Sequence, residues 1–562
     1  MKPSLLSASA LLAALMPAAQ AQFKLQQLSS LPANIGGTAS GAGEITSFDS
    51  STNRLFVTRS ETNVASGVNY FDVSNPSSPQ PLGFIDFSNV FGGGASQIFS
   101  LTSVAVDPAG RGFGVAAIVP KVNAPGSGDY RTGLIGIFDT STGAVLQTLD
   151  VGYHPDSVTF SPDGTRLLVA NEGEYSVLPG VNQRPGSISV LDISGITSAN
   201  KGTSIAGLTS AQVNTVDFST ANITGLRAPA VSLPGTGGNE TMVQAMEPEY
   251  ISVVGDRAFV SLQDNNAMAE LNLSTMTWSS VRSMGTITHS IDAISNSTAM
   301  QTHTITGMPM PDNIAAFTSG GKTYIATANE GDARVDGVGP AATNVDEIRV
   351  SNLGTTNFPG YDGDTPLDRP ALDNLRISRL DGDTDGDGSI NVITTFGTRS
   401  ISIYDADTGD LVWDSGSFLE TQIAANDPTH YADGRSGQKG PEPEALTLGE
   451  VDGRTLLVAG MERSNHIFLF DITDPTAPIF QDFELAGDTY VRPESINFLS
   501  AANSPTGLPM LIVGFEGSGD RATEGLAFFN ITTTAPIPEP SAPLLALGGL
   551  LAGLSRRKRR KL

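Results

Sequence analysis

The stretch Pro155–Glu172 reads PDSVTFSPDGTRLLVANE. A polar start, an alternating run, a Ser-Pro-Asp-Gly turn and a second apolar run predict an antiparallel β-hairpin. Similar stretches, each with a polar start and two β-rich runs around a turn, begin at Glu44, Ser103, Glu249, Asp312, Glu444 and Glu494. The chain therefore contains seven related hairpins.

A second motif follows each hairpin: a β-rich run that ends in an acid or amide and then a turn. Its seven copies are Tyr70–Ser74, Ile137–Ser141, Val190–Ser194, Glu270–Ser274, Ile403–Asp407, Leu469–Thr473 and Phe528–Thr532. Each unit thus supplies about four short antiparallel strands, which favours an all-β, seven-bladed β-propeller over residues 22–532. Insertions follow the third and fifth hairpins, and Phe23–Leu31 could complete the last blade. A pair of β-sandwiches is the alternative fold.

The composition excludes several classes of protein. The chain has 562 residues and no Cys, and its 58 acidic residues outnumber its 32 basic ones. A strongly acidic surface is unsuited to non-specific nucleic-acid binding. The absence of Cys excludes disulfides, zinc-thiolate sites, iron–sulfur clusters and Cys nucleophiles.

The two ends resemble targeting segments. Lys2, an apolar run from Leu5 to Met16 and Ala19-Gln20-Ala21 are typical of a signal peptide over residues 1–21. Residues 533–562 contain Pro538-Glu539-Pro540, an apolar run and a basic cluster, and resemble the PEP-CTERM sorting signal of Gram-negative bacteria. The resemblance implies export, processing by signal peptidase, transient membrane anchoring by the C-terminal apolar run and cleavage near Pro538-Glu539-Pro540 by an exosortase. A plain C-terminal membrane anchor is the alternative.

Acidic residues recur where the first strand of a hairpin starts and where the second ends. Because the two strands are antiparallel, these positions share one pole of a blade. The expected pairs are Glu44 with Glu61, Asp156 with Glu172, Glu249 with Asp264, Asp312 with Glu330, Glu444 with Glu462, and Glu494 with Glu516; Glu247, Glu442, Glu174 and Asp332 lie beside them. So many carboxylates around one opening predict bound Ca²⁺. The alternative is that they only cap strands in solvated turns.

A second acidic segment lies in an expected insertion, residues 333–398. Asp383, Asp385 and Asp387, with Ser389 and Asn391, resemble the first half of an EF-hand loop and predict a Ca²⁺ site. Thr394 stands where the bidentate Glu belongs, so a ligand must come from elsewhere, and Asp362, Asp364 and Asp381 are near in sequence.

Other motifs are weaker. His289, His303, His430 and His466 share no ligand spacing, so we expect solvated or core histidines. Gly320-Gly321-Lys322-Thr323 is similar to part of a phosphate loop, but a hairpin turn fits better because it joins two strands. No Gly-x-Ser-x-Gly elbow occurs.

Several specific motifs resemble the choice-of-anchor I family of secreted propeller proteins. They include Tyr153–Asp156, Ala170–Glu174, Glu247–Tyr250, Ala328–Arg334, Arg399–Ile403 and Gly440–Glu444. Some members are labelled alkaline phosphatase-like or mesenchyme-specific surface glycoprotein-like, and the family looks distantly similar to calcium-dependent propeller phytases. The resemblance implies an exported protein at the cell surface, in the outer envelope or in the extracellular matrix.

Two functions remain open. The first is a surface binding or matrix module whose Ca²⁺ ions rigidify loops and bridge anionic exopolysaccharide. The second is a calcium-dependent phosphomonoesterase acting on a phosphate ester. In the second case Glu249, Asp312, Glu330, Glu444 and Glu494 would hold the ions, while Arg334 or Arg463 holds the phosphate. Glu330, Arg334, Glu444 and Arg463 are then the candidate catalytic residues, with no base assigned.

Overall fold

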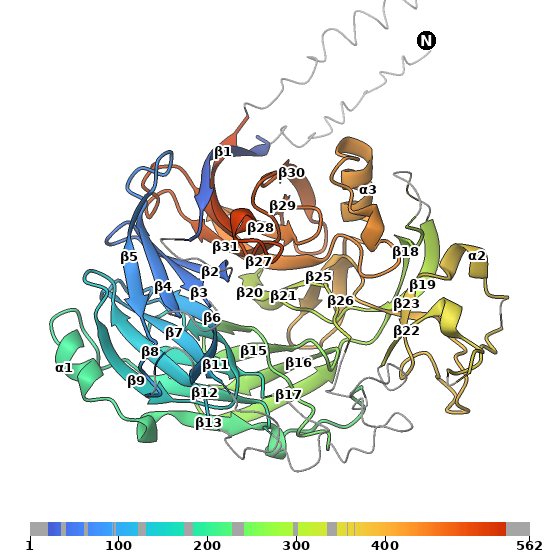
Figure 1. The fold of residues 1–562 in the computed structure, drawn as a ribbon, viewed down its shortest axis with the longest axis horizontal. Helices are drawn as coiled ribbons and strands as arrows, with labels where there is room; N and C mark the ends of the chain where they lie inside the picture. Colours follow the sequence, from blue (N-terminus) through green and yellow to red (C-terminus); the bar gives the residue numbers. More distant parts are fainter. Residues whose placement is uncertain are drawn as a thin grey trace, which may run out of the picture.

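The computed structural model describes residues 21–34, 41–60, 66–92, 94, 97–121, 131–173, 184–227, 241–295, 300, 302–333, 346–356, 358–364 and 366–534. This part of the chain is all-β, as predicted, and its four-stranded antiparallel sheets agree with a propeller. Figure 1 shows the sheets arranged around a common centre. No helix in these ranges has the length and apolar character needed to cross a membrane.

Seven four-stranded sheets are present in the described ranges, and each has the same strand order from its first to its fourth strand. The first strands are β2 (Ala42–Asp49), β6 (Ile98–Val106), β10 (Pro155–Phe160), β14 (Ile251–Val254), β20 (Ile314–Ser319), β27 (Pro443–Val451) and β31 (Pro493–Leu499). The second strands are β3 (Arg54–Arg59), β7 (Phe113–Pro120), β11 (Arg166–Asn171), β15 (Arg257–Leu262), β21 (Lys322–Ala328), β28 (Arg454–Met461) and β32 (Met510–Phe515).

The outer strands complete each sheet. The third strands are β4 (Gly67–Asp72), β8 (Leu134–Asp139), β12 (Ser187–Asp192), β16 (Ala267–Asn272), β25 (Ile401–Asp405), β29 (His466–Asp471) and β33 (Gly525–Thr533). The fourth strands are β5 (Gln80–Asp86), β9 (Val145–Asp150), β13 (Asn214–Asp217), β17 (Thr277–Ser283), β26 (Leu411–Asp414), β30 (Ile479–Leu485) and β1 (Phe23–Pro32).

The apolar core lies between the faces of neighbouring sheets. Val115 of β7 and Val158 of β10 belong to one buried cluster, and Val57 of β3 and Ile512 of β32 to another. Each first strand also contacts the first strand of the next sheet, and β31 contacts β2. Because each sheet buries apolar side chains on both faces, its inner strands are apolar over most of their length.

The first strand of the chain completes the last sheet. β1 pairs antiparallel with β33 from Phe23 opposite Thr533 to Pro32 opposite Gly525, which is the pairing expected for Phe23–Leu31. Asp482 of β30 accepts hydrogen bonds from Lys24 Nζ at 2.7 Å and from the backbone amide of Leu25 at 2.8 Å. The N-terminal strand is therefore held by two neighbouring sheets.

An insertion separates β21 from β25 and forms a lobe with a core of its own. It contains β22 (Glu347–Arg349), α2 (Arg369–Leu372), β23 (Arg376–Ser378) and β24 (Thr394–Phe396). Sequence patterns missed the hairpin of β18 (Ile287–Asp292) and β19 (Thr302–Met308), which joins this lobe because β19 pairs parallel with β24. Buried residues of both segments, such as Ile291 and Ile377, share one apolar cluster.

The remaining helical elements are short. They are α1 (Lys201–Ala206), α3 (Phe418–Asn426) and the 3-10 turns Ser210–Gln212, Phe218–Thr220, Val350–Asn352, Asp433–Arg435 and Arg521–Thr523. The helix α1 lies between β12 and β13, where the insertion after the third hairpin was expected. Figure 1 shows α3 beside the sheet of β27 to β30.

Candidate metal and ligand site

Six of the seven first strands carry an acidic residue at or just before their start. These ring acids are Glu44, Asp156, Glu249, Asp312, Glu444 and Glu494. The first strand β6 starts at Ile98 and departs from the pattern, as the sequence indicated. Since the first strands contact one another in succession, the six carboxyl groups are brought towards one centre.

A repeated local device aims these side chains. In β2, β10, β27 and β31 the strand pairing shifts register around the ring acid, and such a bulge redirects a side chain out of the regular pleat. Four ring acids also follow a residue with positive φ and then a proline. These four triplets are His154-Pro155-Asp156, Met310-Pro311-Asp312, Glu442-Pro443-Glu444 and Arg492-Pro493-Glu494.

The left-handed residue links the start of the first strand to the end of the second. The carbonyl oxygens of His154, Glu442 and Arg492 accept hydrogen bonds from the backbone amides of Glu172, Glu462 and Glu516 at 2.9, 2.8 and 3.1 Å. A left-handed conformation is unfavourable for side chains larger than glycine, and such strain concentrates at functional sites. The paired acids predicted from the sequence are thus tied together through the backbone.

The ring acids interact with each other electrostatically. Burial, followed by the charges of Asp156 and Glu516, raises the pKa of Glu44 to about 8. Burial and the charge of Glu172 raise the pKa of Asp156 to about 7, against a smaller opposing effect of His154. The pKa values of Glu249, Asp312, Glu444 and Glu494 are also raised well above the usual range, first by burial and then by neighbouring carboxylates.

Two ring acids each leave one oxygen without a hydrogen bond. Asp312 Oδ2 and Glu444 Oε2 are buried and have no hydrogen-bond partner in the described part of the chain. A buried carboxylate oxygen without a partner is costly, and native structures usually satisfy it. The ring acids offer carboxylate oxygens as ligands, and these suit hard divalent cations such as Ca²⁺. The residues therefore fit the predicted ion.

Two trios of acids bring their oxygens within metal-binding range. In Asp156, Glu172 and Glu249, one oxygen of each residue lies within 4.8 Å of the others. Glu330, Glu442 and Glu462 form a second trio under the same limit. The first trio contains the predicted pair of Asp156 and Glu172, whereas the second joins Glu330 and Glu462, which were predicted to pair with Asp312 and Glu444, to Glu442.

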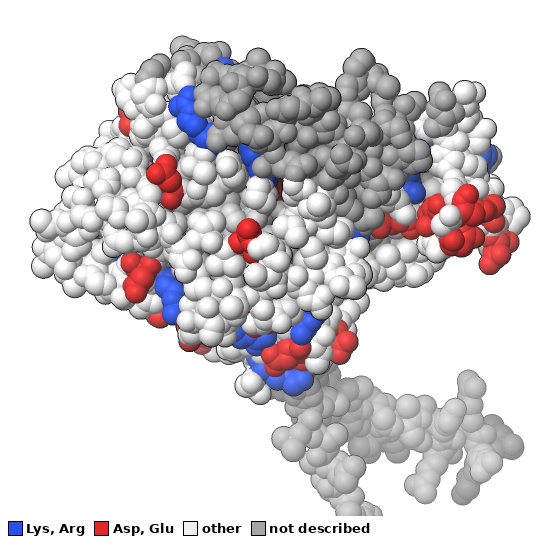
Figure 2. All heavy atoms as spheres, turned by 90° about the horizontal axis from the view of Figure 1, so that it is seen from below, with Lys and Arg blue, Asp and Glu red and all other residues white. Residues whose placement is uncertain are grey.

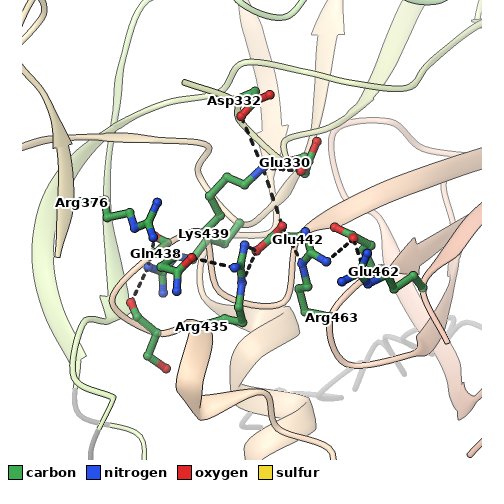
Figure 3. A network of polar contacts seen from close by, with 12 residues as sticks. Glu330, Asp332, Arg376, Arg435, Gln438, Lys439, Glu442, Glu462 and Arg463 are labelled. Carbon is green, nitrogen blue, oxygen red and sulfur yellow. Dashed lines mark hydrogen bonds and ion pairs between the residues drawn. The ribbon is translucent and has the colours of Figure 1, made fainter. Parts of the chain in front are cut away.

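The second trio already has cationic partners (Figure 3). Glu442 accepts a hydrogen bond from Arg435 Nε at 2.8 Å and from Arg463 Nε at 2.9 Å, and Lys439 pairs with Glu330. Burial raises the pKa of Glu442, but the charges of Lys439, Arg463 and Arg435 outweigh this and lower it. Arg463 also pairs with Glu462, so this trio is neutralised within the chain.

The first trio has no ion pair with Lys or Arg in the described part of the chain. His154 Nδ1 lies 2.9 Å from Glu172 Oε2, and this imidazole carries a positive charge only when it is protonated. A divalent ion would therefore compensate more negative charge at Asp156, Glu172 and Glu249 than at the second trio. The electrostatics single out the first trio as the better metal site.

The other predicted residues occupy varied places around these trios. Glu247 is buried before β14, and its amide donates to Asn265 Oδ1 at 3.3 Å. Asp332 is exposed, 3.8 Å from Lys439 Nζ. Glu516 accepts a hydrogen bond from Arg492 Nη1 at 3.0 Å. Glu61, Glu174 and the candidate catalytic Arg334 lie outside the described residues.

Two cations at the second trio, Arg435 and Lys439, were not predicted from the sequence. They line a cavity of about 340 Å³ together with Asp332, Glu347, Arg376 and Gln438. Their closeness to Glu442 in the sequence is the signal that could have indicated them. The candidate catalytic residues Glu330 and Arg463 lie in this network, whereas Glu444 belongs to the ring.

The acidic loop of the insertion is exposed between β23 and β24. Asp383 accepts hydrogen bonds from the amides of Gly386 and Gly388 at 2.8 and 2.9 Å. Oxygens of Asp385 and Asp387 instead lie within 4.8 Å of Asp362. Figure 2 shows acidic side chains gathered at the edge of the molecule that the insertion occupies.

The last residues of this loop make hydrogen bonds within the loop and do not add to the group of Asp362, Asp385 and Asp387. The amide of Ser389 donates to Asp387 at 2.8 Å, and Asn391 Oδ1 accepts from the amide of Thr384 at 2.9 Å. The Thr394 hydroxyl donates to the carbonyl of Asp381 at 3.2 Å. Asp362, from outside the loop, is thus the carboxylate brought beside Asp385 and Asp387.

The sequence of this chain is similar to a known domain family and to parts of two known proteins. A model of the Choice-of-anchor I domain matches residues 44–475. The Mesenchyme-specific cell surface glycoprotein of Strongylocentrotus purpuratus is 27% identical over 214 residues, 32% of this chain and 28% of that protein. Gigasin-3a of Magallana gigas is 26% identical over 199 residues, 30% of this chain and 68% of that protein. The chain thus covers less than a third of the sea urchin glycoprotein.

Solved structures that align with most of this chain share little sequence with it. A chain of Kuenenia stuttgartiensis hydrazine synthase aligns over 90% of this chain and 99% of its own length, with 12% identity and a TM-score of 0.41.

Proposed function

Because the chain belongs to the choice-of-anchor I domain family, we propose that it is an exported calcium-binding β-propeller protein that acts as a binding or matrix module. Its place is the cell surface, the outer envelope or the extracellular matrix of a Gram-negative bacterium. The similarity to a protein named as a cell surface glycoprotein supports the extracellular setting. The proposed signal peptide and PEP-CTERM segment lie almost wholly outside the described residues.

The proposed fold is a closed seven-bladed propeller over residues 22–532, with residues 333–398 as a calcium-loop insertion. Support comes from the seven four-stranded sheets, the contact between β31 and β2, and the pairing of β1 with β33. Closure would place the ring acids around one axial opening, where their mutual repulsion calls for a cation. Signal peptidase and an exosortase are the proposed processing partners, and anionic exopolysaccharide is the proposed ligand.

One observation carries the calcium proposal: buried carboxyl groups from different sheets converge, and Asp312 and Glu444 each leave an oxygen unsatisfied. Ca²⁺ bound at Asp156, Glu172 and Glu249 would link two neighbouring sheets and neutralise their charge. A second Ca²⁺ at Asp362, Asp385 and Asp387 would order the insertion loop. Carboxylate-bound Ca²⁺ with open coordination positions can also bridge to acidic sugars.

Calorimetric titration of the chelator-treated full chain with Ca²⁺ tests this proposal. We expect Glu249→Gln to weaken binding at the ring by at least about tenfold, because it removes one charged ligand of a trio. Glu450→Gln, which removes an exposed carboxylate from β27, is the matched control and should bind as the wild type does. Asp387→Asn should affect only the insertion site. Absence of Ca²⁺ binding by the wild type would disprove the proposal.

A calcium-dependent phosphomonoesterase is the second candidate. The cavity lined by Arg376, Arg435 and Lys439 favours it, since clustered cations can hold a phosphate. Hydrolysis of p-nitrophenyl phosphate with and without Ca²⁺ separates the two functions. Activity that Glu330→Gln and Glu444→Gln abolish, while Glu450→Gln retains it, would favour the enzyme; inactivity at acidic, neutral and alkaline pH would favour the binding module.

A further inference from the structure

The second sheet carries an aromatic residue at the place of a ring acid. In β10 and β31 the strand pairing skips one residue near the strand start, and that residue is the ring acid, Asp156 or Glu494. In β6, which contacts both β2 and β10, the pairing passes from Ile98 to Ser100 and skips Phe99. The position that has no acid in this sheet is therefore taken by Phe99.

An irregular strand start presents Phe99 to solvent. Phe99 is 63% exposed, whereas the six ring acids are half-buried. A second register shift follows between Ser100 and Ser103, and the buried Ser100 hydroxyl has no hydrogen-bond partner in the described part of the chain. Bulges are frequent beside active sites because they redirect side chains, and an unsatisfied hydroxyl costs free energy. The strand thus gives up regular pairing at the point where it exposes an aromatic ring.

Hydrogen bonds to both neighbouring sheets fix this strand start. The amide of Leu101 donates to Ser60 Oγ at 2.5 Å, and the Thr102 hydroxyl donates to the carbonyl of Pro155 at 2.6 Å. Ser60 follows β3, and Pro155 begins β10. The position of Phe99 beside the ring is therefore set before any ligand binds, which lowers the entropy cost of binding.

Phe99 lies next to the first trio. Its ring centroid is 6.4 Å from that of His154, and the two rings meet edge to face at 67°. His154 Nδ1 in turn lies 2.9 Å from Glu172 Oε2. One imidazole therefore separates the exposed aromatic ring from a carboxylate of the proposed calcium site.

A Ca²⁺ ion at the first trio would have coordination positions left over. Ca²⁺ takes about 6–8 oxygen ligands, and Asp156, Glu172 and Glu249 supply three when each binds through one oxygen. A uronic acid, which is a sugar with a carboxylate, offers carboxylate and hydroxyl oxygens for the remaining positions. The C–H groups on one face of its ring can pack on an aromatic face, where the π electrons carry negative charge. Such packing also removes apolar surface from water.

We propose that Phe99 is the stacking surface for a uronic acid ring of an acidic polysaccharide whose carboxylate completes the coordination of Ca²⁺ at the first trio. The proposal rests on the proposed calcium-binding function and adds to it the sugar class and the residue that selects it. A neutral sugar would have only hydroxyl oxygens to offer the ion, and a non-sugar carboxylate would have no ring to stack. Phe99 and the trio together therefore distinguish uronic acids from both.

Calorimetric titration of the full chain with trigalacturonate, a short uronic acid oligomer, in excess Ca²⁺ tests the stacking surface. We expect Phe99→Ala to weaken binding by at least about fivefold, because the aromatic face is lost. Phe99→Tyr keeps the ring and should bind as the wild type does. Ile479→Ala, which removes a 56% exposed apolar side chain from β30, is the matched control and should also bind normally. Maltotriose, a neutral trisaccharide, should bind at least about tenfold more weakly than trigalacturonate.

Titration with Ca²⁺ alone separates this inference from the proposed function. Phe99→Ala should bind Ca²⁺ as the wild type does, because Phe99 offers no ligand oxygen, and excess chelator should abolish trigalacturonate binding by the wild type. A wild type that binds Ca²⁺ but not trigalacturonate, or equal trigalacturonate binding by Phe99→Ala, would overturn the inference and leave the calcium proposal standing. Equal binding of maltotriose, or trigalacturonate binding that persists in chelator, would also overturn it. Absence of Ca²⁺ binding by the wild type would overturn both.

Discussion

At the scale of single residues, Arg399 connects the end of β18, α3 and the segment that follows α3. It is fully buried and donates hydrogen bonds to the carbonyls of Asp292, Ser436 and Gln438 at 2.7, 2.7 and 2.9 Å. Its charge is balanced by Glu420 of α3 at 2.8 Å, and both side chains are at most 2% exposed. The pair therefore joins three segments that are distant in the sequence.

Replacement of Glu420 should show how much free energy of unfolding is lost when the buried charge of Arg399 has no counterion. We expect Glu420→Gln to lower the free energy of unfolding by ~3–5 kcal/mol, because Arg399 then lacks a counterion. Urea denaturation followed by fluorescence measures the change. Glu450→Gln removes an exposed carboxylate and should leave the denaturation midpoint in place; equal midpoints for the two variants would contradict the prediction.

At the scale of elements, sequence patterns predicted the paired strands better than the lobe. The hairpins repeat because a sheet buried on both faces demands apolar strands and turn residues at fixed offsets, and Pro155–Glu172 shows both. The hairpin of β18 and β19 was missed because its strands pair with β24, about 90 residues later, rather than with a neighbour in one of the repeated units. Short-range patterns carry no signal for such a partner.

The N-terminal strand offers an element-scale prediction. We expect Asp482→Ala to loosen β1, because the side chain that binds Lys24 and the amide of Leu25 is lost. Hydrogen exchange followed by mass spectrometry should show faster exchange of residues 23–32, while β2 exchanges as before. Asp474→Ala, in the exposed turn before β30, is the control. Unchanged exchange in β1 would show that its pairing with β33 suffices.

At the scale of the whole molecule, the repeated units predicted that the ring acids lie close together. They did not predict the cations that neutralise the neighbouring trio of Glu330, Glu442 and Glu462. The paired positions share a pole in any such unit, so Asp156 and Glu172 could be matched from spacing alone. Arg435 and Lys439 come from an irregular segment. Those positions depend on tertiary packing, which leaves no periodic mark in the sequence.

The raised pKa values predict how stability depends on pH. Glu44 and Asp156 release protons at about pH 8 and about pH 7 in the folded chain, but near their usual values when unfolded. At pH values between the unfolded and the folded pKa, these two carboxyl groups are ionised in the unfolded chain and protonated in the folded chain. Metal-free protein should therefore lose stability as pH rises from mildly acidic to about 8. Each pKa unit corresponds to ~1.4 kcal/mol for a group.

Thermal unfolding in excess chelator at several pH values measures this effect. We expect the midpoint to fall by several degrees as pH rises, and Glu44→Gln to flatten the dependence because it removes one titrating group. Ca²⁺ should restore the midpoint at alkaline pH. A midpoint in chelator that rises with pH would contradict the repulsion between ring acids.

The position of β33 has a mechanical consequence. This strand lies between β1 and β32, and Thr533 at its end is paired with Phe23. A force applied through the segment beyond Thr534 would first separate Thr533 and Thr532 from β1 and would then have to break the pairing of residues 525–530 on both edges, with β1 and with β32. A tether at this end would therefore load an interior strand, which resists peeling more than an edge strand does.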